Sequence, residues 1–145
     1  MQQECRWHFD ELIDCRIFNN PDLDRRLTKH IGAHPQIIAD LLGDARNINI
    51  CFRQAAQALS RNAGRVVPKT RLVIGIFCKS GTHRSVAMTL LLTSVLRNSG
   101  VQVDGAQYWS QWYWQAAKCQ PQCRECQFRL SDSSATRALN AWRAL

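Results

Sequence analysis

Residues 71–97 combine an apolar run, a short polar loop and a long helical pattern, and this stretch constrains the fold more than any other. The apolar run at its start is interrupted only by Gly75, a pattern typical of a strand that is buried on both faces. From Ser85 onward the apolar residues form a wide helical stripe, which predicts a largely buried helix ending near Arg97. The sequence therefore predicts a strand, a tight loop and a helix in direct succession.

The loop between the strand and the helix carries residues suited to binding an anion. Backbone N–H groups at a helix N-terminus lack intrahelical partners, and the helix dipole adds partial positive charge there. Side-chain charge comes from Lys79 and Arg84, and Gly81 would let the backbone approach a ligand. We expect the ligand-binding residues of the loop to be Cys78, Lys79, Ser80, Gly81, Thr82, His83, Arg84 and Ser85. The alternative is that Ser80 or Thr82 only caps a buried helix.

The order Cys-x-x-Gly-x-x-Arg-Ser resembles the signature loop of protein tyrosine and dual-specificity phosphatases. This resemblance implies a catalytic site in which Cys78 is a thiolate nucleophile and Arg84 holds the phosphoryl oxygens. Ser85 would help the thiolate to leave. The general acid would be Asp40 or Asp44.

A second resemblance covers more of the chain. An upstream segment contains Asp14, Arg16, Asn20 and Pro21, and the loop contains Cys78, Gly81, His83, Arg84 and Ser85. The two segments, in this order and at this separation, resemble the C-terminal domain of the RapZ family of bacterial RNase adapter proteins. The similarity runs from about residue 10 to residue 103. The His-Arg pair before Ser is characteristic of this family and is not required by phosphatase chemistry, so we favour this interpretation.

The RapZ resemblance implies an α/β domain that acts as a sensing and binding module, more than as an enzyme, and that needs no cofactor. In bacteria its loop binds a phosphorylated small molecule, glucosamine 6-phosphate, and its basic surface binds small regulatory RNA. We expect Arg84 to be the main anion clamp and His83 to be a pH-sensitive hydrogen-bond partner. Asp14, Arg16 and Asn20 would orient the loop or the far end of the ligand. The alternative for Asp14 is an ion pair with Arg16 or Arg84 that only supports the fold.

The chain also departs from the family pattern. Phe77, Lys79 and Ser80 replace the usual Gly, Thr and Gly, which makes the loop bulkier and more basic. Asp22 stands where an aromatic residue or His usually follows the Asn-Pro pair, which removes a possible ligand contact. No Gly-x-x-x-x-Gly-Lys-[Ser/Thr] sequence occurs, so we predict no ATP binding by this chain.

Composition sets the remaining limits. A chain of 145 residues with 46% hydrophobic residues suits one domain with a real core. The absence of a long apolar run and of a secretory signal predicts a cytoplasmic protein without a membrane partner. A net charge of +8 favours polyanionic partners such as RNA, although a generally basic solvated surface explains it equally well. The sequence sets no oligomeric state.

Other patterns complete the predicted fold. A strand over 11–18 would place Asp14 and Arg16 on the same face, and helices are predicted over 35–42 and 48–61. Strands joined by helices pair in parallel, and ligands bind at the carboxyl ends of such strands. We therefore predict a single three-layer α/β domain with a small, mainly parallel sheet. Residues 1–107 would form the RapZ-like domain, and residues 108–145 a helical extension packed on it.

The C-terminal extension is rich in tryptophan and cysteine. Its aromatic residues would either pack a helix onto the domain, which we favour, or stack on nucleic-acid bases beside Lys118, Arg124 and Arg129. The cysteines Cys119, Cys123 and Cys126 follow Cys-x-x-x-Cys-x-x-Cys spacing, but the chain is too short for a radical-SAM barrel. A structural zinc site would need a fourth ligand, which could be Cys5, His8 or another distant residue. Reduced thiols without metal are the default in a cytosolic protein.

Overall fold

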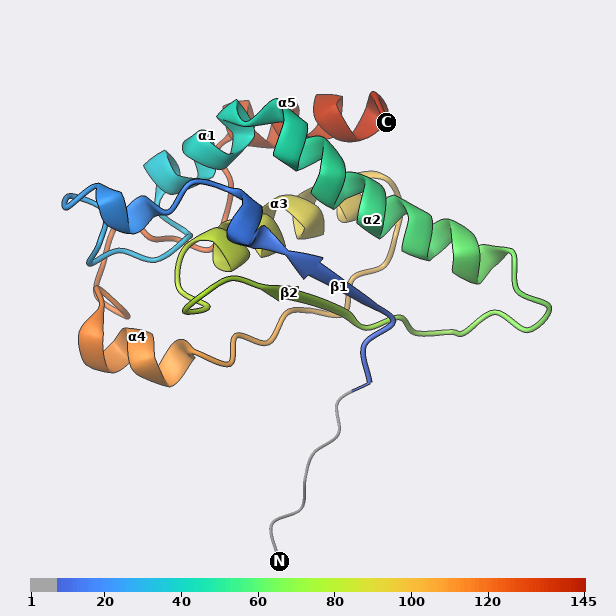
Figure 1. The fold of residues 1–145 in the computed structure, drawn as a ribbon, viewed down its shortest axis with the longest axis horizontal. Helices are drawn as coiled ribbons and strands as arrows, with labels where there is room; N and C mark the ends of the chain where they lie inside the picture. Colours follow the sequence, from blue (N-terminus) through green and yellow to red (C-terminus); the bar gives the residue numbers. More distant parts are fainter. Residues whose placement is uncertain (1–7) are drawn as a thin grey trace, which may run out of the picture.

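The computed structural model describes residues 8–145, so Cys5 lies outside the described residues. Figure 1 shows a small sheet beside a group of helices. In chain order the elements are β1 (Glu11–Asp14), the 3-10 turns η1 (Cys15–Ile17) and η2 (Pro21–Leu23), α1 (Pro35–Gly43), α2 (Ala45–Ala63), β2 (Ile74–Phe77), α3 (Arg84–Asn98), α4 (Gln111–Ala117) and α5 (Asp132–Arg143).

Among the described residues the sheet consists of β1 and β2, which pair in parallel with Glu11 opposite Ile74 and Asp14 opposite Phe77. β1 is shorter than the predicted strand over 11–18. It ends at Asp14 because the Asp14 carboxylate accepts the backbone N–H of Arg16 at 2.9 Å and starts the turn η1. The expectation that Asp14 and Arg16 share one face of a strand is therefore wrong.

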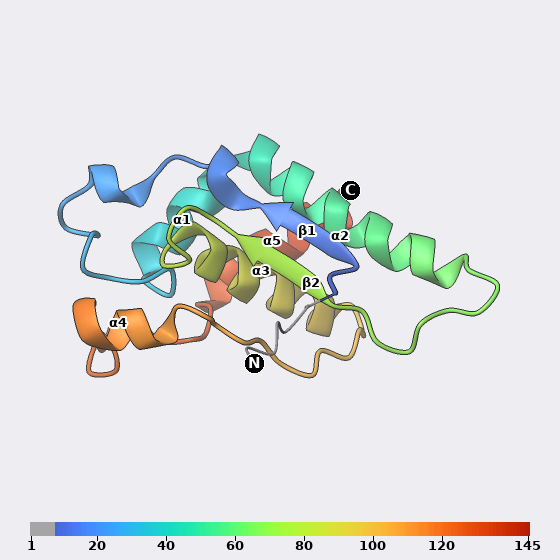
Figure 2. The same ribbon diagram turned by 60° about the horizontal axis from the view of Figure 1, so that its bottom comes forward.

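Helices α1, α2, α3 and α5 lie on one side of the sheet, whereas α4 lies apart from them, and Figure 2 shows both strands in front of α2, α3 and α5. Ile13 faces the helices and is fully buried, whereas Leu12 beside it is 51% exposed. β2 is also only partly covered, with Phe77 37% exposed, so the prediction of a strand buried on both faces is wrong. α2 packs against β1 and α3 packs against β2, and α5 packs against both helices, which gives three layers: the sheet, an inner pair of helices and an outer helix layer. The predicted class, a small α/β domain with a parallel sheet, is confirmed.

Two helices begin where side chains satisfy free backbone N–H groups. At α1, Pro35 occupies the first turn and the His34 ring accepts the backbone N–H of Gln36. At α2, the Asp44 carboxylate accepts the N–H of Asn47 at 3.2 Å, so this helix begins three residues before the predicted start at residue 48. Both predicted helices are present.

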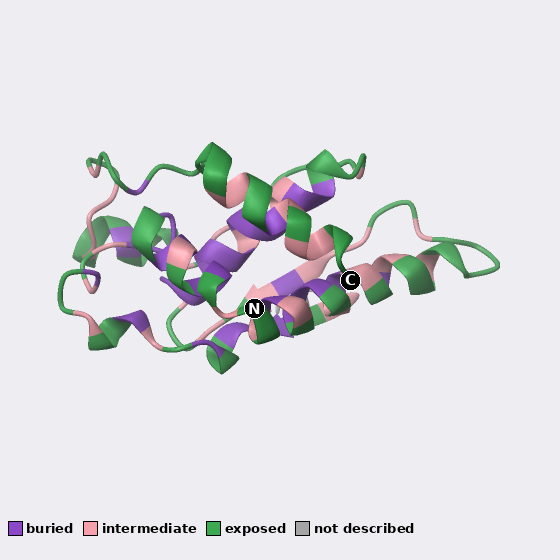
Figure 3. Ribbon diagram, turned by 90° about the horizontal axis from the view of Figure 1, so that it is seen from above, coloured by how far each residue is buried: buried purple, intermediate pink, exposed green. Residues whose placement is uncertain are grey.

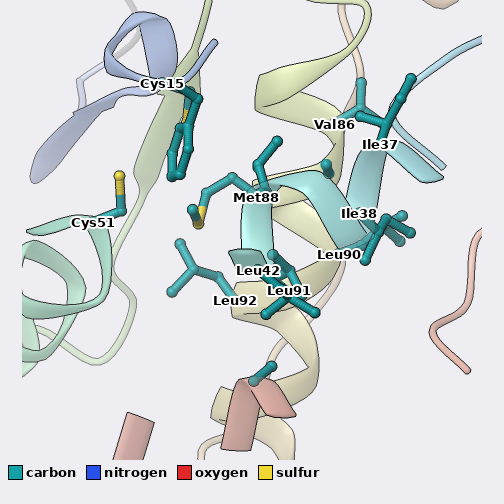
Figure 4. Packing of buried hydrophobic residues seen from close by; sticks show 14 of the residues in the cluster. Cys15, Ile37, Ile38, Leu42, Cys51, Val86, Met88, Leu90, Leu91 and Leu92 are labelled. Carbon is teal, nitrogen blue, oxygen red and sulfur yellow. The ribbon is translucent and has the colours of Figure 1, made fainter. Parts of the chain in front are cut away.

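The core is built around α3, which is largely buried as its wide apolar stripe predicts. Figure 4 shows Met88 and Leu92 of α3 near Cys15 of η1 and Cys51 of α2 in the core. Figure 3 shows buried positions continuing through the centre of the molecule, while the outer helix surfaces are exposed.

The C-terminal extension contributes three residues to the same core: Trp114, Cys126 and Ala138. The Trp114 ring lies against those of Tyr108 and Phe128, with centroids 5.3 and 6.3 Å away. α5 packs on α1, α2 and α3. Dividing the chain at residue 107 stays a prediction. Within residues 8–145, none of the helices has the length and apolarity needed to cross a bilayer.

Candidate functional site

A cavity of about 210 Å³ lies at the carboxyl edge of the sheet. Because β1 and β2 run in parallel, the segments that follow them meet at this edge. The first segment supplies Asn20 and Asp22. The second is the loop between β2 and α3, and the full lining is Asn20, Asp22, Cys78, Lys79, Ser80, His83 and Arg84.

Cys78 follows β2, and its sulfur faces the first turn of α3. The sulfur lies 3.2 Å from the Ser85 hydroxyl and accepts the Ser85 backbone N–H at 3.4 Å. Burial would raise the pKa of this thiol, but hydrogen bonds from Ser85 and Gly81 and the charge of Arg84 outweigh it, so the pKa lies below its usual value. The sulfur therefore occupies the position where a helix N-terminus stabilises negative charge.

Gly81 makes the tight turn of the loop, with a φ of +64°. A Cβ at this position would lie 2.6 Å from the hydroxyl oxygen of Ser110, which donates to the Ser80 carbonyl at 3.2 Å. Ser110 precedes α4, so the C-terminal extension contacts the loop directly. No local sequence pattern predicts this contact, because it joins positions 30 residues apart.

Arg84 is the first residue of α3 and is only 7% exposed. Its Nη1 donates to the backbone carbonyls of Arg16 at 3.2 Å and Phe18 at 3.0 Å. Within residues 8–145 these are the only acceptors that its guanidinium reaches, which leaves Nε and Nη2 available to an anion in the cavity. The same side chain therefore ties the turn after β1 to α3.

His83 is 3% exposed, and both of its ring nitrogens have neighbours. The His30 carbonyl lies 2.7 Å from Nε2, which assigns the proton of the neutral ring to Nε2 because a carbonyl only accepts. Nδ1 lies 3.3 Å from a carboxylate oxygen of Asp22. Burial lowers the pKa of His83, opposed by the His30 carbonyl and by Asp22.

Asp22 is the lining residue that the sequence reasoning missed. Its position was interpreted as a lost ligand contact, yet the carboxylate lines the cavity beside His83. The Asn20 side chain accepts the backbone N–H of Asp22 at 3.1 Å and thereby folds η2 toward the loop. The sequence did contain a signal for a site residue at this position, because Asp22 directly follows the Asn-Pro pair.

Several predicted site residues do not line the cavity. Asp14 and Arg16 form a two-pronged ion pair, with Arg16 lying over the Phe77 ring at 5.3 Å. This pair matches the alternative in which Asp14 only supports the fold. Thr82 is fully buried, and Ser85 is covered beneath Cys78.

Neither predicted general acid reaches the cavity, so the prediction of Asp40 or Asp44 in that role is wrong. Asp40 is on α1, where it accepts a hydrogen bond from Gln36 at 2.8 Å. Asp44 caps α2 and is bonded to Asn47. Both carboxylates are used in helix contacts away from the lining residues.

The extension cysteines converge on a residue from the first half of the chain. Cys119, Cys123 and Cys126 lie around Nδ1 of His30, and the four possible ligand atoms are all within 4.8 Å of one another. The sequence indicated the cysteines but could not single out His30 as the fourth member. The proposed alternative His8 instead lies 3.9 Å from Asp10.

The fold and the cavity define a small parallel α/β domain with a polar pocket between two strand ends and a helix N-terminus. Residues 2–107 match the family described as the RapZ C-terminal domain. The chain belongs to this family, as the two sequence segments predicted.

Curated relatives agree with this assignment. A nucleotide-binding protein of Anaeromyxobacter sp. (strain K) is 31% identical over 102 residues, which cover 66% of this chain and 33% of the relative. A nucleotide-binding protein of Ruegeria pomeroyi is 31% identical over 97 residues, and one of Deinococcus radiodurans is 30% identical over 100, each covering 66% of this chain and 34% of the relative. The chain thus spans about a third of the length of these relatives. No solved structure matches it.

Proposed function

We propose that this domain is a regulatory module that binds a phosphorylated small molecule in the cavity between η2 and the loop from β2 to α3. The observation that carries the proposal is one cavity that is lined by Arg84 and Lys79 and lies at the N-terminus of α3. These groups match the charge and the acceptor-rich surface of a phosphate. The volume of about 210 Å³ suits a phosphate with a small organic group and is below that of drug-sized pockets.

The remaining lining residues favour a sugar phosphate over a simple anion. Asn20 offers an amide, and Asp22 places a carboxylate on the wall formed by η2. A carboxylate beside a phosphate site is unfavourable for a second anionic group but suits a hydroxyl or ammonium group on the ligand. An amino sugar phosphate supplies both kinds of group.

Calorimetry on the purified chain tests the proposal with glucosamine 6-phosphate, glucosamine, inorganic phosphate and AMP. We expect glucosamine 6-phosphate to bind and glucosamine to bind much more weakly, because only the former engages the cationic groups. Tighter binding of AMP would instead favour a nucleotide, in line with the names of the relatives. No binding of any phosphorylated compound would contradict the proposal.

Lys79→Ala is the most informative variant, because this side chain is exposed and lines the cavity. We expect it to weaken phosphate-ester binding roughly two- to tenfold, the effect of one solvent-accessible charge-assisted contact. The matched control is Arg65→Ala, which removes an exposed cation beyond α2 and should leave affinity unchanged. Arg84→Ala would weaken binding more, but it also removes the bonds to Arg16 and Phe18 and needs a check of folding.

We propose RNA binding as a second property of the domain, which would use its basic surface. Some of that charge is neutralised, because Arg61, Lys69 and Arg71 each form an ion pair with a carboxylate. For this reason we favour the small phosphorylated ligand over RNA as the main partner of the domain. An RNA contact through phosphates should weaken steeply with salt, and a flat response in a salt titration would contradict it.

The lowered pKa of Cys78 favours one second candidate, a cysteine-dependent phosphatase. In that case Asp22, on the opposite wall, would be the available carboxyl group instead of Asp40 or Asp44. Under the binding proposal we expect no hydrolysis of p-nitrophenyl phosphate. Turnover that Cys78→Ser abolishes while phosphate affinity remains would favour the enzyme.

A further inference from the structure

The loop between α4 and α5 brings three sulfurs and one imidazole nitrogen to a single point. Cys119, Cys123 and Cys126 come from this loop, and His30 comes from the segment before α1, about 90 residues earlier. Three cysteine sulfurs and one histidine nitrogen are a common ligand set of structural zinc sites. Here the four ligands come from two distant segments of the chain.

The distances agree with one tetrahedral ion. Zn–S bonds of about 2.3 Å and Zn–N bonds of about 2.0 to 2.1 Å place a sulfur and a nitrogen ligand about 3.6 Å apart. The His30 Nδ1 lies 3.5 Å from the Cys123 sulfur and 3.5 Å from the Cys126 sulfur. The whole set is within 4.8 Å, which fits one ion. An iron–sulfur cube would hold its cysteine sulfurs farther apart, because iron and sulfide atoms lie between them.

A backbone hydrogen bond shapes the loop that carries the cysteines. The N–H of Cys123 donates to the Cys119 carbonyl at 3.1 Å, which closes a turn between the first two cysteines. The cysteines are free thiols in the structure, so none of the sulfurs is withdrawn into a disulfide.

Hydrogen bonds beside the cluster hold the cysteine loop against the segment that carries His30. The N–H of Cys119 donates to the Lys29 carbonyl at 2.9 Å, and the Lys118 ammonium donates to the Thr28 carbonyl at 2.7 Å. Next to the cluster, His34 contacts the Glu125 carboxylate at 3.0 Å. These contacts hold the two segments side by side around the four ligand atoms.

We propose that Cys119, Cys123, Cys126 and the His30 Nδ1 bind one structural zinc ion, which fastens the C-terminal extension to the segment over residues 27–34. The three cysteines lie beyond residues 2–107, the part that matches the family, so the site belongs to the extension of this chain.

The site has a consequence for the cavity. The carbonyl of His30 accepts the bond from His83, and the backbone N–H of Gly32 donates to the Thr82 carbonyl at 2.8 Å. A Cβ at Gly32 would lie 1.9 Å from the His83 carbonyl oxygen, so the two segments are in close backbone contact. Zinc would therefore stabilise the segment that contacts the anion-binding loop. The effect on ligand binding rests on the proposed function, whereas the metal site does not.

Metal content of the full chain tests the site. Protein produced in zinc-supplemented medium and purified under reducing conditions should contain about one equivalent of zinc by mass spectrometry. Cys123→Ser should lose most of it. Cys78→Ser is the matched control, the same chemical change on the other side of His83, and should keep its zinc.

Cobalt provides a readout that does not depend on a variant folding. Adding Co²⁺ to the metal-free wild-type chain should produce the visible bands of a tetrahedral ion and near-ultraviolet thiolate-to-cobalt charge transfer. A wild-type chain that is purified without metal and develops no such bands would overturn the proposal. Bound iron with sulfide, or equal metal loss in Cys78→Ser and Cys123→Ser, would also overturn it.

Hydrogen exchange tests whether zinc stabilises the segment over residues 27–34 and the loop beside it. Removing zinc with a chelator should lower the melting temperature by roughly 10 °C or more and should increase amide exchange over residues 27–34 and 82–84. Faster exchange confined to the cysteine loop would contradict this stabilising role. These measurements need no ligand, so their failure and a failure of the proposed function are distinguishable.

Discussion

At the scale of single residues, Cys78 shows how one set of contacts prepares a position for negative charge. Its sulfur faces the Ser85 N–H and hydroxyl at the start of α3, and the Arg84 charge lies close by. An oxyanion bound in the cavity would meet the same helix terminus and the same guanidinium. A thiol with a lowered pKa is therefore expected in a binding module as well as in a phosphatase, and turnover alone separates them.

Alkylation of Cys78 against pH measures this environment. Because the pKa is lowered, the rate of reaction with iodoacetamide should reach half of its high-pH plateau at a pH below the usual thiol pKa of 9.0. Ser85→Ala removes the hydroxyl but keeps the N–H, so the pKa should rise and the rate near neutral pH should fall roughly two- to tenfold. Peptide mass spectrometry follows the modification of Cys78 specifically.

The control for this measurement is Ser94→Ala, the same change on α3 away from the loop, which should leave the rate unchanged. A Cys78 profile that is identical in wild type and Ser85→Ala would show that the hydroxyl does not stabilise the thiolate.

At the scale of elements, the connection between β1 and the segment before β2 depends on one carboxylate. Asp10 accepts the backbone N–H of Val73 at 2.7 Å and pairs with the Lys69 ammonium. The N–H of Asp10 donates to the Val73 carbonyl at 2.8 Å, which extends the pairing beyond the sheet. This carboxylate thus helps to set the register that brings both strand ends to the cavity.

Asp10→Asn should lower the free energy of unfolding by about 1 to 2 kcal/mol near neutral pH, because the ion pair is lost while an oxygen acceptor remains. The hydrogen bond from Lys69 and that from Val73 hold the pKa of Asp10 below its usual value of 3.8. The stabilisation is therefore fully present above pH 3.8 and is lost as the pH falls through the lower folded-state pKa. Urea denaturation at neutral and acid pH measures the difference.

Asp40→Asn is the control, because an amide oxygen can still accept the bond from Gln36. It should change stability little at any pH. A difference between wild type and Asp10→Asn that persists unchanged well below pH 3.8 would contradict the assignment.

Local signals predicted the helices well, and long-range contacts account for what was missed. Pro35 begins α1 as its fixed φ favours, and the helix ends at Gly43, the predicted stop. The early end of β1 depends on the Asp14 side chain, which an apolar pattern does not reveal. His30 could not be singled out, because the cysteines that it meets lie about 90 residues later in the sequence. The position of Asp22 after the Asn-Pro pair was a usable signal, but its contact with His83 joins distant segments.

At the scale of the whole molecule, the C-terminal extension shares the core of the family domain. Trp114 is 1% exposed, whereas Trp112 on the same helix is 73% exposed and Trp109 is 59% exposed. The sequence favoured packing for the aromatic cluster as a group, but only a structure shows that a single tryptophan of α4 is buried. The exposed Trp112 ring keeps the stacking alternative open.

Trp114 tests whether the extension and the domain unfold together. Trp114→Ala removes a large buried ring and should lower the free energy of unfolding by about 3 to 5 kcal/mol. Trp114→Phe should cost less, because it keeps an aromatic ring and removes an indole N–H that has no hydrogen-bond partner within residues 8–145. Trp112→Ala, on the exposed side of α4, should change stability by no more than about 0.5 kcal/mol.

Urea denaturation followed by circular dichroism distinguishes one cooperative unit from two. If Trp114, Cys126 and Ala138 belong to the core that α3 organises, Trp114→Ala shifts the entire transition to lower urea and leaves it a single step. An extension that folded on its own would lose its structure in a separate early step while the midpoint of the remaining helices stayed in place. The proposed zinc ligands come from both parts of the chain, since His30 lies in the domain and the three cysteines lie in the extension. If the two parts unfold in one transition, zinc bound at this site stabilises the loop around Arg84 as well, because the carbonyl of His30 is hydrogen-bonded to His83.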